Sequence, residues 1–348
     1  MQVMSQLINF PSGQVAFHFD SAFDELWSFC DRDHTVIVTN GHLAHLYARL
    51  FSGCKLLVVQ PGEHSKDLHT ISSLTSQLLA LGATRQTTLV GVGGGVITDI
   101  VGFLGSVYMR GVPFGFVPTT LLGMVDAAIG GKNGVNSGMH KNIIGTITQP
   151  RFVLYDCSFL DTLPDDEWSN GFAEIIKYAC IFDAPLFEEL ASHNISYYQD
   201  ESDEALRAVI NKCVNWKIKT VQEDEKESGI RRLLNFGHTA AHAIENLYEL
   251  PHGKAVGIGM VIACMISAEV AGLDKSVTGK LKSMLAQYHL PVKMHISPLK
   301  AMGILKLDKK RVDDKIEYVV IEKAGKAATR LLPFETIENA LRTYESNS

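Results

Sequence analysis

The stretch TTLVGVGGGVITDIVGF, residues 87–103, decides which fold the chain is expected to adopt. An apolar run ends in glycines between residues 91 and 95, and a helical pattern is expected to begin near Thr98 and Asp99. Consecutive glycines at a strand-to-helix turn let the backbone approach a pyrophosphate, and the free N–H groups of the following helix attract an anion. The GxGxxG spacing is absent, so a tight turn that only packs on the sheet is the alternative interpretation.

The segments around this turn predict an α/β domain with a Rossmann-like, largely parallel sheet over residues 1–156. Short β-branched runs alternate with helical patterns such as residues 66–81, and this alternation is typical of βαβ units. The expected strands are HTVIVTN, KLLVVQPG, the glycine-rich stretch itself, FGFVPTTLL and RFVLYD. Long amphipathic patterns dominate residues 157–348, so we expect a second, mainly α-helical domain, interrupted by one hairpin over residues 315–333.

Bulk composition excludes several classes of protein. The 348 residues carry a net charge of -6 and are 46% hydrophobic, which favours a globular protein and argues against a nucleic-acid binder. The apolar run over residues 255–273 contains Glu269 and is expected to be a core helix, not a membrane span. No secretory signal is visible, and the six cysteines are scattered without a CxxC pair. We therefore expect reduced thiols and a cytoplasmic protein.

Two polar segments could hold an anionic ligand. PGEHSK places Glu63 and Lys66 after a strand, where a carboxylate could bind a ribose hydroxyl or simply cap a helix. VDAAIGGKNGVNSGMHKNIIG carries Lys132, Lys141 and Asn142 among glycines, and such side chains could reach a phosphate. A solvated surface loop is the alternative interpretation of the second segment.

Histidines mark the C-terminal half as a candidate metal site. His238 and His242 in NFGHTAAHAIE lie four residues apart on one helix face, and His252 follows in PHGKAVGIGM. FAEIIKYA adds Glu174, and a carboxylate with two imidazoles suits a catalytic zinc ion. Spacing alone selects His238 and His242 as the ligand pair, and core histidines bonded to neighbours are the alternative. The apolar surroundings predict that these polar side chains are buried.

The motifs together resemble 3-dehydroquinate synthase, of the sugar phosphate cyclase superfamily, from about residue 34 to residue 325. The resemblance implies conversion of 3-deoxy-D-arabino-heptulosonate 7-phosphate to 3-dehydroquinate and phosphate, a step of the shikimate pathway. It implies transient oxidation by NAD, phosphate elimination, re-reduction and an intramolecular aldol closure. The motifs that carry it, in order, are GGGVITDIVGF, YMRGV, PTTLL, VDAAIGGKNGVN, KNIIG, AEIIKY, NFGHTAAHAIE and HGKAVGIGM.

The resemblance assigns a role to each matching position. It implies Zn²⁺, or Co²⁺ in its place, on Glu174, His238 and His252, which overrules the choice made from spacing. It implies that Arg110 reaches the active site of a neighbouring subunit in a homodimer. The implied NAD contacts are Glu63, Lys66, Gly94, Gly95, Asp99, Thr119, Thr120, Lys132 and Lys141. The implied substrate pocket contains Asp126, Lys132, Asn142, Lys177, Lys217, Glu227, Arg231, Asn235, His242 and either Lys309 or Lys310.

Two other enzyme groups share this scaffold. Sister cyclases, 2-deoxy-scyllo-inosose synthase and the epi-valiolone synthases, act on substrates without a carboxylate, whereas Lys217 and Arg231 are expected to pair with one. Metal-dependent polyol dehydrogenases release NADH and have little use for a phosphate-binding set. The chain departs from the family pattern at Thr98, where glycine is usual, and at His140, which adds a titratable group.

Overall fold

The computed structural model describes residues 4–138, 140–306 and 311–346. The chain divides into two compact units. Unit 1 comprises Met1–Pro164 together with Lys217–Lys226, and unit 2 comprises Asp165–Trp216 together with Glu227–Ser348.

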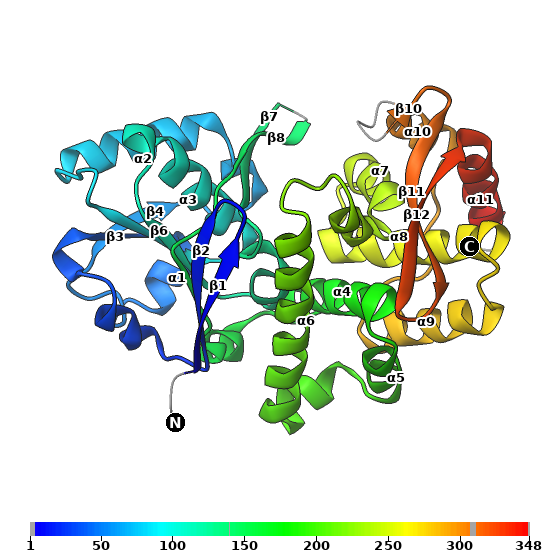
Figure 1. Cartoon of the computed structure of the whole chain (residues 1–348), viewed down its shortest axis with the longest axis horizontal. Helices are drawn as coiled ribbons and strands as arrows, with labels where there is room; N and C mark the ends of the chain where they lie inside the picture. The colour runs from blue at the N-terminus through cyan, green and yellow to red at the C-terminus, as the bar shows by residue number, and fades with distance from the viewer. Residues whose placement is uncertain (1–3, 139, 307–310, 347–348) are drawn as a thin grey trace. The chain divides into compact units, whose positions relative to one another are not determined.

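Unit 1 is built on a seven-stranded sheet with the order β1-β2-β9-β6-β5-β3-β4 (Figure 1). Neighbouring strands run parallel except for the antiparallel pair β1 and β2, which confirms the expected α/β fold. The strands are β1 (Met4–Phe10), β2 (Gly13–Phe19), β3 (Thr35–Asn40), β4 (Lys55–Val59), β5 (Thr88–Gly93), β6 (Phe114–Pro118) and β9 (Phe152–Leu154). The helices are α1 (Gly41–Leu46), α2 (Leu68–Ala80) and α3 (Gly95–Val107).

The central strands form because their residues are apolar on both faces. Every residue of β6 is buried, as are the first five residues of β3, and continuous apolar runs are typical of parallel strands covered on both sides. Beyond β5, α3 begins at Gly95, so the expected start near Thr98 was about one turn too late. Gly94 precedes the helix in an extended conformation, and no side chain caps it, so the sequence lacked the usual start signal.

The lysine-rich segment forms a two-stranded antiparallel hairpin of β7 (Lys132–Ser137) and β8 (His140–Ile147), so the interpretation as a loop was wrong. Asn133, Gly134 and Val135 of β7 are buried, whereas most of β8 is exposed. The strand β7 packs against α3. Buried backbone needs hydrogen-bonded partners, and the second strand supplies them.

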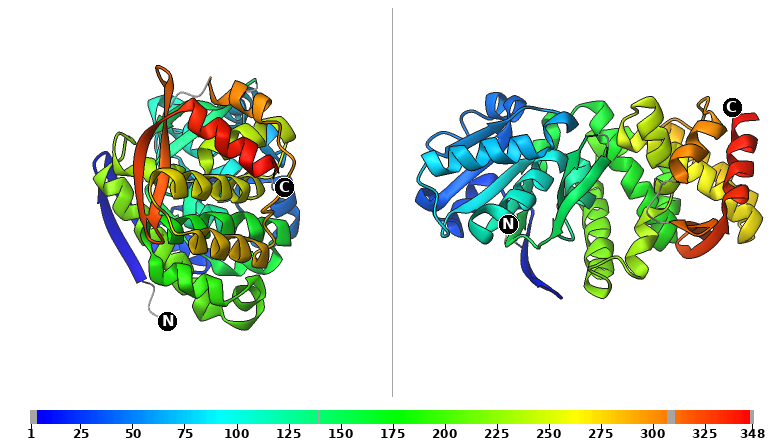
Figure 2. Two further views of the ribbon diagram at one scale, coloured as in Figure 1. Left: turned by 90° about the vertical axis from the view of Figure 1, so that its right-hand side faces the viewer. Right: turned by 90° about the horizontal axis from the view of Figure 1, so that it is seen from above.

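Unit 2 is mainly helical, as expected, and contains a small antiparallel sheet of order β10-β11-β12. The hairpin of β11 and β12 lies against α8 and α11 (Figures 1 and 2). The helices are α4 (Asp165–Phe182), α5 (Ala184–Ser192), α6 (Asp203–Glu223), α7 (His238–Tyr248), α8 (His252–Val270), α9 (Lys275–Gln287), α10 (Pro298–Leu305) and α11 (Phe334–Ser346). Helix α6 belongs to unit 2 only as far as Trp216. The strands are β10 (Arg311–Val312), β11 (Lys315–Lys323) and β12 (Lys326–Pro333).

Helix α8 is the central helix of unit 2. Among the described residues it alone is long and apolar enough to cross a membrane, and 72% of its most apolar window is buried inside the protein. Its burial by α4, α7, α9 and β11 explains why it is apolar all round.

Candidate metal centre and cofactor turn

Helix α4 carries a buried carboxylate and a buried cation one turn apart. The side chains of Glu174 and Lys177 are 1% and 2% exposed, and they form an ion pair within the helix. Burial would raise the pKa of Glu174, but the Lys177 ammonium and the neighbouring imidazoles hold that pKa well below its usual range. Glu174 is therefore an anion at neutral pH, as a carboxylate ligand of a metal ion must be.

The first turn of α8 approaches α4 closely because a glycine stands at the contact. A Cβ on Gly253 would lie 2.6 Å from the Cα of Asn170, so a larger residue would push the helices apart. The N–H of Gly253 donates to Oδ1 of Asn170 at 3.1 Å, which satisfies a free donor at the start of α8. Asn170 and Glu174 lie four residues apart on one face of α4, so this contact brings His252 to the carboxylate.

A second glycine brings α7 to α8. Gly237 precedes α7 with a φ of +77°, in the left-handed region that favours glycine. A Cβ on Gly237 would lie 2.9 Å from the backbone nitrogen of Met260 on α8. The backbones of the two segments can therefore meet directly, and His238 stands at the first position of α7 beside this contact.

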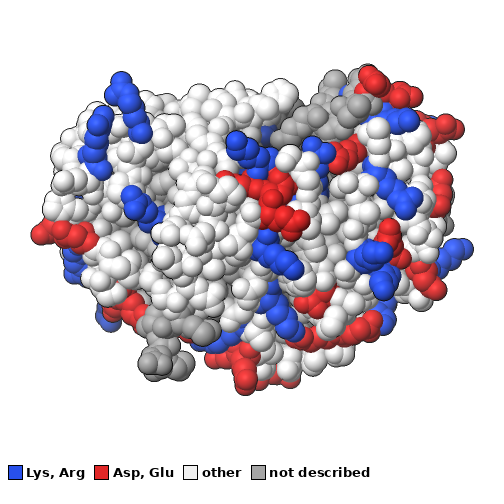
Figure 3. All heavy atoms as spheres, viewed as in Figure 1, with Lys and Arg blue, Asp and Glu red and all other residues white. Residues whose placement is uncertain are grey.

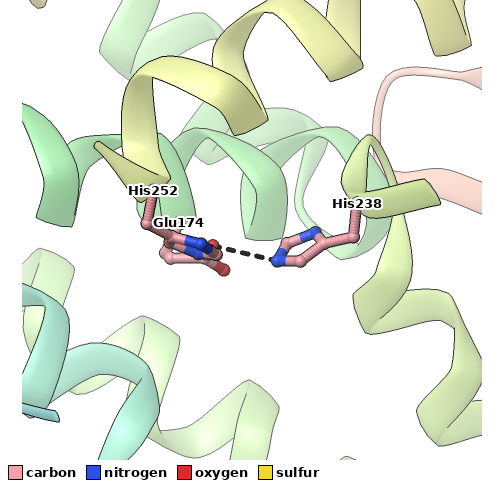
Figure 4. Close-up of side chains that lie close together, drawn as sticks. All are labelled: Glu174, His238 and His252. Carbon is pink, nitrogen blue, oxygen red and sulfur yellow. Dashed lines mark hydrogen bonds and ion pairs between the residues drawn. The ribbon is translucent and has the colours of Figure 1, made fainter. Parts of the chain in front are cut away.

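Three side chains from three helices converge at this place (Figure 4). Nε2 of His238 lies 3.3 Å and Nε2 of His252 lies 3.0 Å from the same oxygen, Oε1 of Glu174. His242 is not a member of the group, although its ring centroid lies 5.7 Å from that of His238, so the choice made from spacing was wrong. His242 is exposed, contrary to the expectation that it would be buried.

Both imidazoles turn Nε2 toward Glu174 and Nδ1 toward an acceptor outside the group. Nδ1 of His238 lies 3.1 Å from the carbonyl oxygen of Phe236, and Nδ1 of His252 lies 3.8 Å from the carboxylate of Glu245. Burial lowers the pKa of His238. Burial also disfavours protonation of His252, but its interactions with Glu174 and Glu245 raise its pKa to about 10.

The donor set fits a divalent metal ion such as Zn²⁺. The ligand atoms of Glu174, His238 and His252 lie within 4.8 Å of one another, and two nitrogens with one oxygen are the ligands that catalytic zinc sites use. An outer acceptor behind each imidazole is also typical of such sites. Three protein ligands would leave a coordination position for a substrate oxygen.

Other expected substrate residues of unit 2 lie on the segment before α7. The side chain of Arg231 is among the largest that are fully buried, with the residue only 2% exposed. Nδ2 of Asn235 donates to Oε1 of Glu227 at 2.6 Å, and both residues are partly buried. These contacts order the segment between α6 and α7.

In unit 1 the turn between β5 and α3 suits the backbone approach of a pyrophosphate. A Cβ on Gly94 would lie 2.9 Å from Cγ2 of Thr120, so a side chain at this position would have to displace that of Thr120. The N–H of Thr119 donates to the carbonyl of Gly93 at 3.1 Å, which ties the end of β6 to this turn. The strand order reverses between β3 and β5, and ligands of parallel sheets bind at such a point.

Asp99 of α3 forms an ion pair with Lys66, which is 4% exposed. Burial raises the pKa of Asp99, and the Lys66 ammonium opposes that shift. Thr98 is also buried, and its hydroxyl donates to the carbonyl of Gly95 at 3.0 Å. The Thr98 side chain therefore has its hydrogen bond within the helix.

The hairpin of β7 and β8 carries Lys132, Lys141 and Asn142 as exposed side chains, together with exposed His140. Asp126 lies in a π-helical turn, Gly123–Ala127, where Nζ of Lys217 contacts its Oδ1 at 2.9 Å and donates to its carbonyl at 2.6 Å. Lys217 belongs to the segment of α6 that folds with unit 1.

Three of the expected site residues have left-handed backbones. Arg110, Asn142 and Glu227 have φ values of 67°, 53° and 60°, a region that residues other than glycine seldom occupy. Strained backbone is found preferentially at functional sites. Lys309 and Lys310, which also belong to the expected set, lie outside the described residues.

Three residues that support the candidate site were not predicted from the sequence: Asn170, Glu245 and Asn136. Glu245 lies on α7 and its partner His252 lies on α8, so helical spacing contained no signal for their contact. On the face drawn in Figure 3, basic and acidic side chains of the described residues are interspersed over the surface.

Two family models together match most of the chain. The 3-dehydroquinate synthase N-terminal model matches residues 56–170, and the C-terminal model matches residues 171–311. The chain belongs to the 3-dehydroquinate synthase family. A curated member of this family, the 3-dehydroquinate synthase of Pyrococcus furiosus, is 45% identical over 273 residues, which are 78% of this chain and 79% of that one. The resemblance inferred from the motifs is thus confirmed.

Solved structures of sister cyclases share the family's fold. The 2-epi-5-epi-valiolone synthase of Streptomyces hygroscopicus, with NAD+ and Zn²⁺ bound, is 32% identical with a TM-score of 0.83, covering 90% of this chain and 92% of that one. A 2-deoxy-scyllo-inosose synthase complexed with carbaglucose-6-phosphate, NAD+ and Co²⁺ is 25% identical with a TM-score of 0.86, covering 98% of this chain and 100% of that one.

Proposed function

We propose that this chain is a 3-dehydroquinate synthase, a phosphate-eliminating lyase that converts 3-deoxy-D-arabino-heptulosonate 7-phosphate to 3-dehydroquinate and phosphate. The observation that carries the proposal is the convergence of Glu174, His238 and His252 on one point within a member of this family. The proposal places the enzyme in the shikimate pathway of aromatic amino acid biosynthesis.

The proposed cofactors are NAD and Zn²⁺, with Co²⁺ able to take the place of zinc. When bound, the metal supplies Lewis-acid polarisation of a substrate oxygen, and NAD accepts a hydride and returns it. Glu174, His238 and His252 would hold the metal. The residues that would hold NAD in unit 1 are Glu63, Lys66, Gly94, Gly95, Asp99, Thr119, Thr120, Lys132 and Lys141.

The remaining site residues bind and orient the anionic substrate. Arg231 offers a planar guanidinium that can pair with a carboxylate through two hydrogen bonds, and it shares this task with Lys217. Lys132, Asn142 and His242 donate to the phosphate and stabilise the negative charge as it leaves. Asp126 holds the ammonium of Lys217, Lys177 holds the carboxylate of Glu174, and Glu227 holds the amide of Asn235.

The presence of Lys217 and Arg231 favours dehydroquinate synthase over its sister cyclases, because an ammonium and a planar guanidinium suit the carboxylate that only the heptulosonate substrate carries. We assign NAD binding to residues 1–156, and we assign metal binding and most of the substrate contacts to residues 157–348. All six cysteines are free thiols, which supports a cytoplasmic location.

The direct test is phosphate release from 3-deoxy-D-arabino-heptulosonate 7-phosphate with NAD, with and without a chelator. Chelator-sensitive release, with dehydroquinate formed and no net NADH, is the expected result. NADH that accumulates with glycerol as substrate would assign the chain to the polyol dehydrogenases. Turnover of glucose 6-phosphate in place of the heptulosonate would assign it to the sister cyclases.

We also propose a homodimer in which Arg110 reaches the neighbouring active site. The support is its exposure in a turn where Met109, Arg110 and Gly111 all have positive φ values of 48°, 67° and 112°. Arg110→Ala should lose activity and remain folded, whereas exposed Arg85→Ala should keep activity. Mixing Arg110→Ala with Glu174→Gln chains should restore turnover, because the mixed dimer has one complete site; no recovery would contradict action across the interface.

A further inference from the structure

Asn136 lies where the ladder between β7 and β8 is interrupted. Val135 pairs with Ile144 and Ser137 pairs with His140, so between these pairs Asn136 alone stands opposite residues 141–143. Such a bulge releases a residue from the strand pairing and redirects its side chain. Asn136 is thereby free to contact a segment outside the hairpin.

The backbone of Asn136 joins the hairpin to the segment that follows β4. Its N–H donates to the carbonyl of Lys66 at 2.7 Å, and Asn136 forms an isolated parallel bridge with Asp67. The segment that follows β4 therefore pairs with the hairpin at one position only, in the way that a neighbouring strand would. Lys66 in turn forms the ion pair with Asp99 of α3.

The side chain of Asn136 uses both ends of its amide. Its Nδ2 donates to Oε1 of Glu63 at 2.8 Å, and its Oδ1 accepts from the backbone N–H of Asn142 at 2.9 Å. Asn142 has a φ of 53°, so this hydrogen bond holds a conformation that the backbone does not favour by itself. One side chain thus fixes two residues that come from separate segments.

We propose that Asn136 is a positioning residue that aligns Glu63 for the cofactor and Asn142 for the substrate phosphate at the same time. This inference rests on the function proposed above, in which Glu63 binds NAD and Asn142 binds phosphate. Asparagine suits the role because its amide is donor and acceptor at once. Aspartate keeps an acceptor for Asn142 but loses the donor to Glu63 and places a second carboxylate beside it.

The experiment compares Asn136→Ala with Asn136→Asp in the full chain with Zn²⁺ bound. NAD binding is titrated without substrate, and KM and kcat for the heptulosonate phosphate are measured at saturating NAD. Asn9→Ala is the matched control, because Asn9 lies in the hairpin of β1 and β2 and its Oδ1 also accepts one side-chain hydrogen bond, from Gln14 at 2.7 Å.

Alanine should raise the Kd for NAD and the KM for substrate, each by about tenfold, the effect of losing one hydrogen bond to a charged or strained group. Aspartate should raise the Kd for NAD at least as much but leave the KM within about twofold of wild type, since it still accepts from Asn142. The control should change neither constant.

Unchanged constants in Asn136→Ala would overturn the inference. An aspartate variant that raises KM as much as the alanine variant does would also overturn the inference. That result would indicate general damage to the hairpin and not the loss of one hydrogen bond. The NAD titration needs no turnover, so it tests the link to Glu63 even if the wild-type chain does not convert the heptulosonate phosphate. Absence of wild-type turnover would contradict the proposed function instead.

Discussion

The proposed cofactor turn of unit 1 and the candidate metal centre of unit 2 are built in opposite ways. The turn consists of neighbours in the chain, from the end of β5 through Gly94 into α3. The metal centre joins Glu174 to His238 and to His252, which lies 78 positions further along the chain. The turn depends on local backbone conformation, whereas the metal centre depends on how three helices pack. Substitutions in one region should therefore change the binding of its own ligand and leave the ligand of the other region unaffected.

The largest effect is expected from Glu174→Gln. Loss of a charged ligand should weaken Zn²⁺ binding by more than about 100-fold and abolish phosphate release. Mutation of residues that only hydrogen-bond to metal ligands already lowers metal affinity by about 10- to 100-fold, and loss of a ligand itself should cost more. Lys177 would also lose its buried partner, so the free energy of unfolding should fall by about 3 kcal/mol. The Kd for NAD should not change, because the residues proposed to bind NAD lie in unit 1.

Competition with a chromophoric chelator, urea unfolding and NAD titration measure these three quantities. Glu167→Gln, the same change earlier in α4, is the control. Wild-type Zn²⁺ affinity in Glu174→Gln would show that Glu174 is not a ligand.

The pH dependence of metal binding should distinguish the two histidines. His252 has its pKa raised to about 10 in the metal-free protein, so Zn²⁺ must displace a proton from it, whereas the lowered pKa of His238 leaves that ring neutral. The apparent affinity should rise about tenfold per pH unit between pH 7 and pH 9. A raised folded-state pKa also means that the metal-free protein loses stability as pH rises from the usual value of 6.5 toward 10.

Glu245→Gln should flatten this pH dependence, because the Glu245 carboxylate is one cause of the raised pKa. Chelator competition at several pH values measures the slope. A slope that is identical in the variant and the wild type would show that Glu245 does not influence His252.

A smaller effect is expected where α8 meets α4. In Gly253→Ala the new Cβ would lie 2.6 Å from the Cα of Asn170, so the helices must separate and His252 must move from Glu174. Zn²⁺ affinity should fall by about tenfold, corresponding to a packing cost of 1–3 kcal/mol. Gly257→Ala in the same helix is the control, since its Cβ would meet its nearest neighbour at 3.5 Å. Equal affinities in the two variants would contradict this account of the close approach.

The smallest effect is expected in unit 1. In Gly94→Ala the new methyl group would lie 2.9 Å from Cγ2 of Thr120, a side-chain atom that can move. NAD binding should weaken by about fivefold, and Zn²⁺ binding should stay unchanged. Gly13→Ala, where a Cβ would meet nothing within 4 Å, is the control. Weakened Zn²⁺ binding in Gly94→Ala would show that the two regions are not independent.

Much of unit 1 was predictable from local sequence. The strands β3 to β6 lie where apolar runs meet turn residues, because burial on both faces demands continuous apolar side chains. The start of α3 was misplaced, since Gly94 carries no side chain to mark it. The bulge at Asn136 gave no local signal, because it depends on which segment lies beside the hairpin.

Local sequence was enough to indicate the family, the strands β3 to β6 and the residue types available for the chemistry, but it did not reveal the hairpins of β1 with β2 and of β7 with β8. Helical spacing could not select His252 over His242, although the resemblance to the family did. Helix packing is what groups His252 with Glu174 and His238, and packing also makes residues 217–226 fold with unit 1. The difference arises from the distance along the chain over which each signal acts. Helical periodicity reports only neighbours within a turn or two, whereas the choice of partner depends on where Gly237 and Gly253 let backbones from distant segments touch.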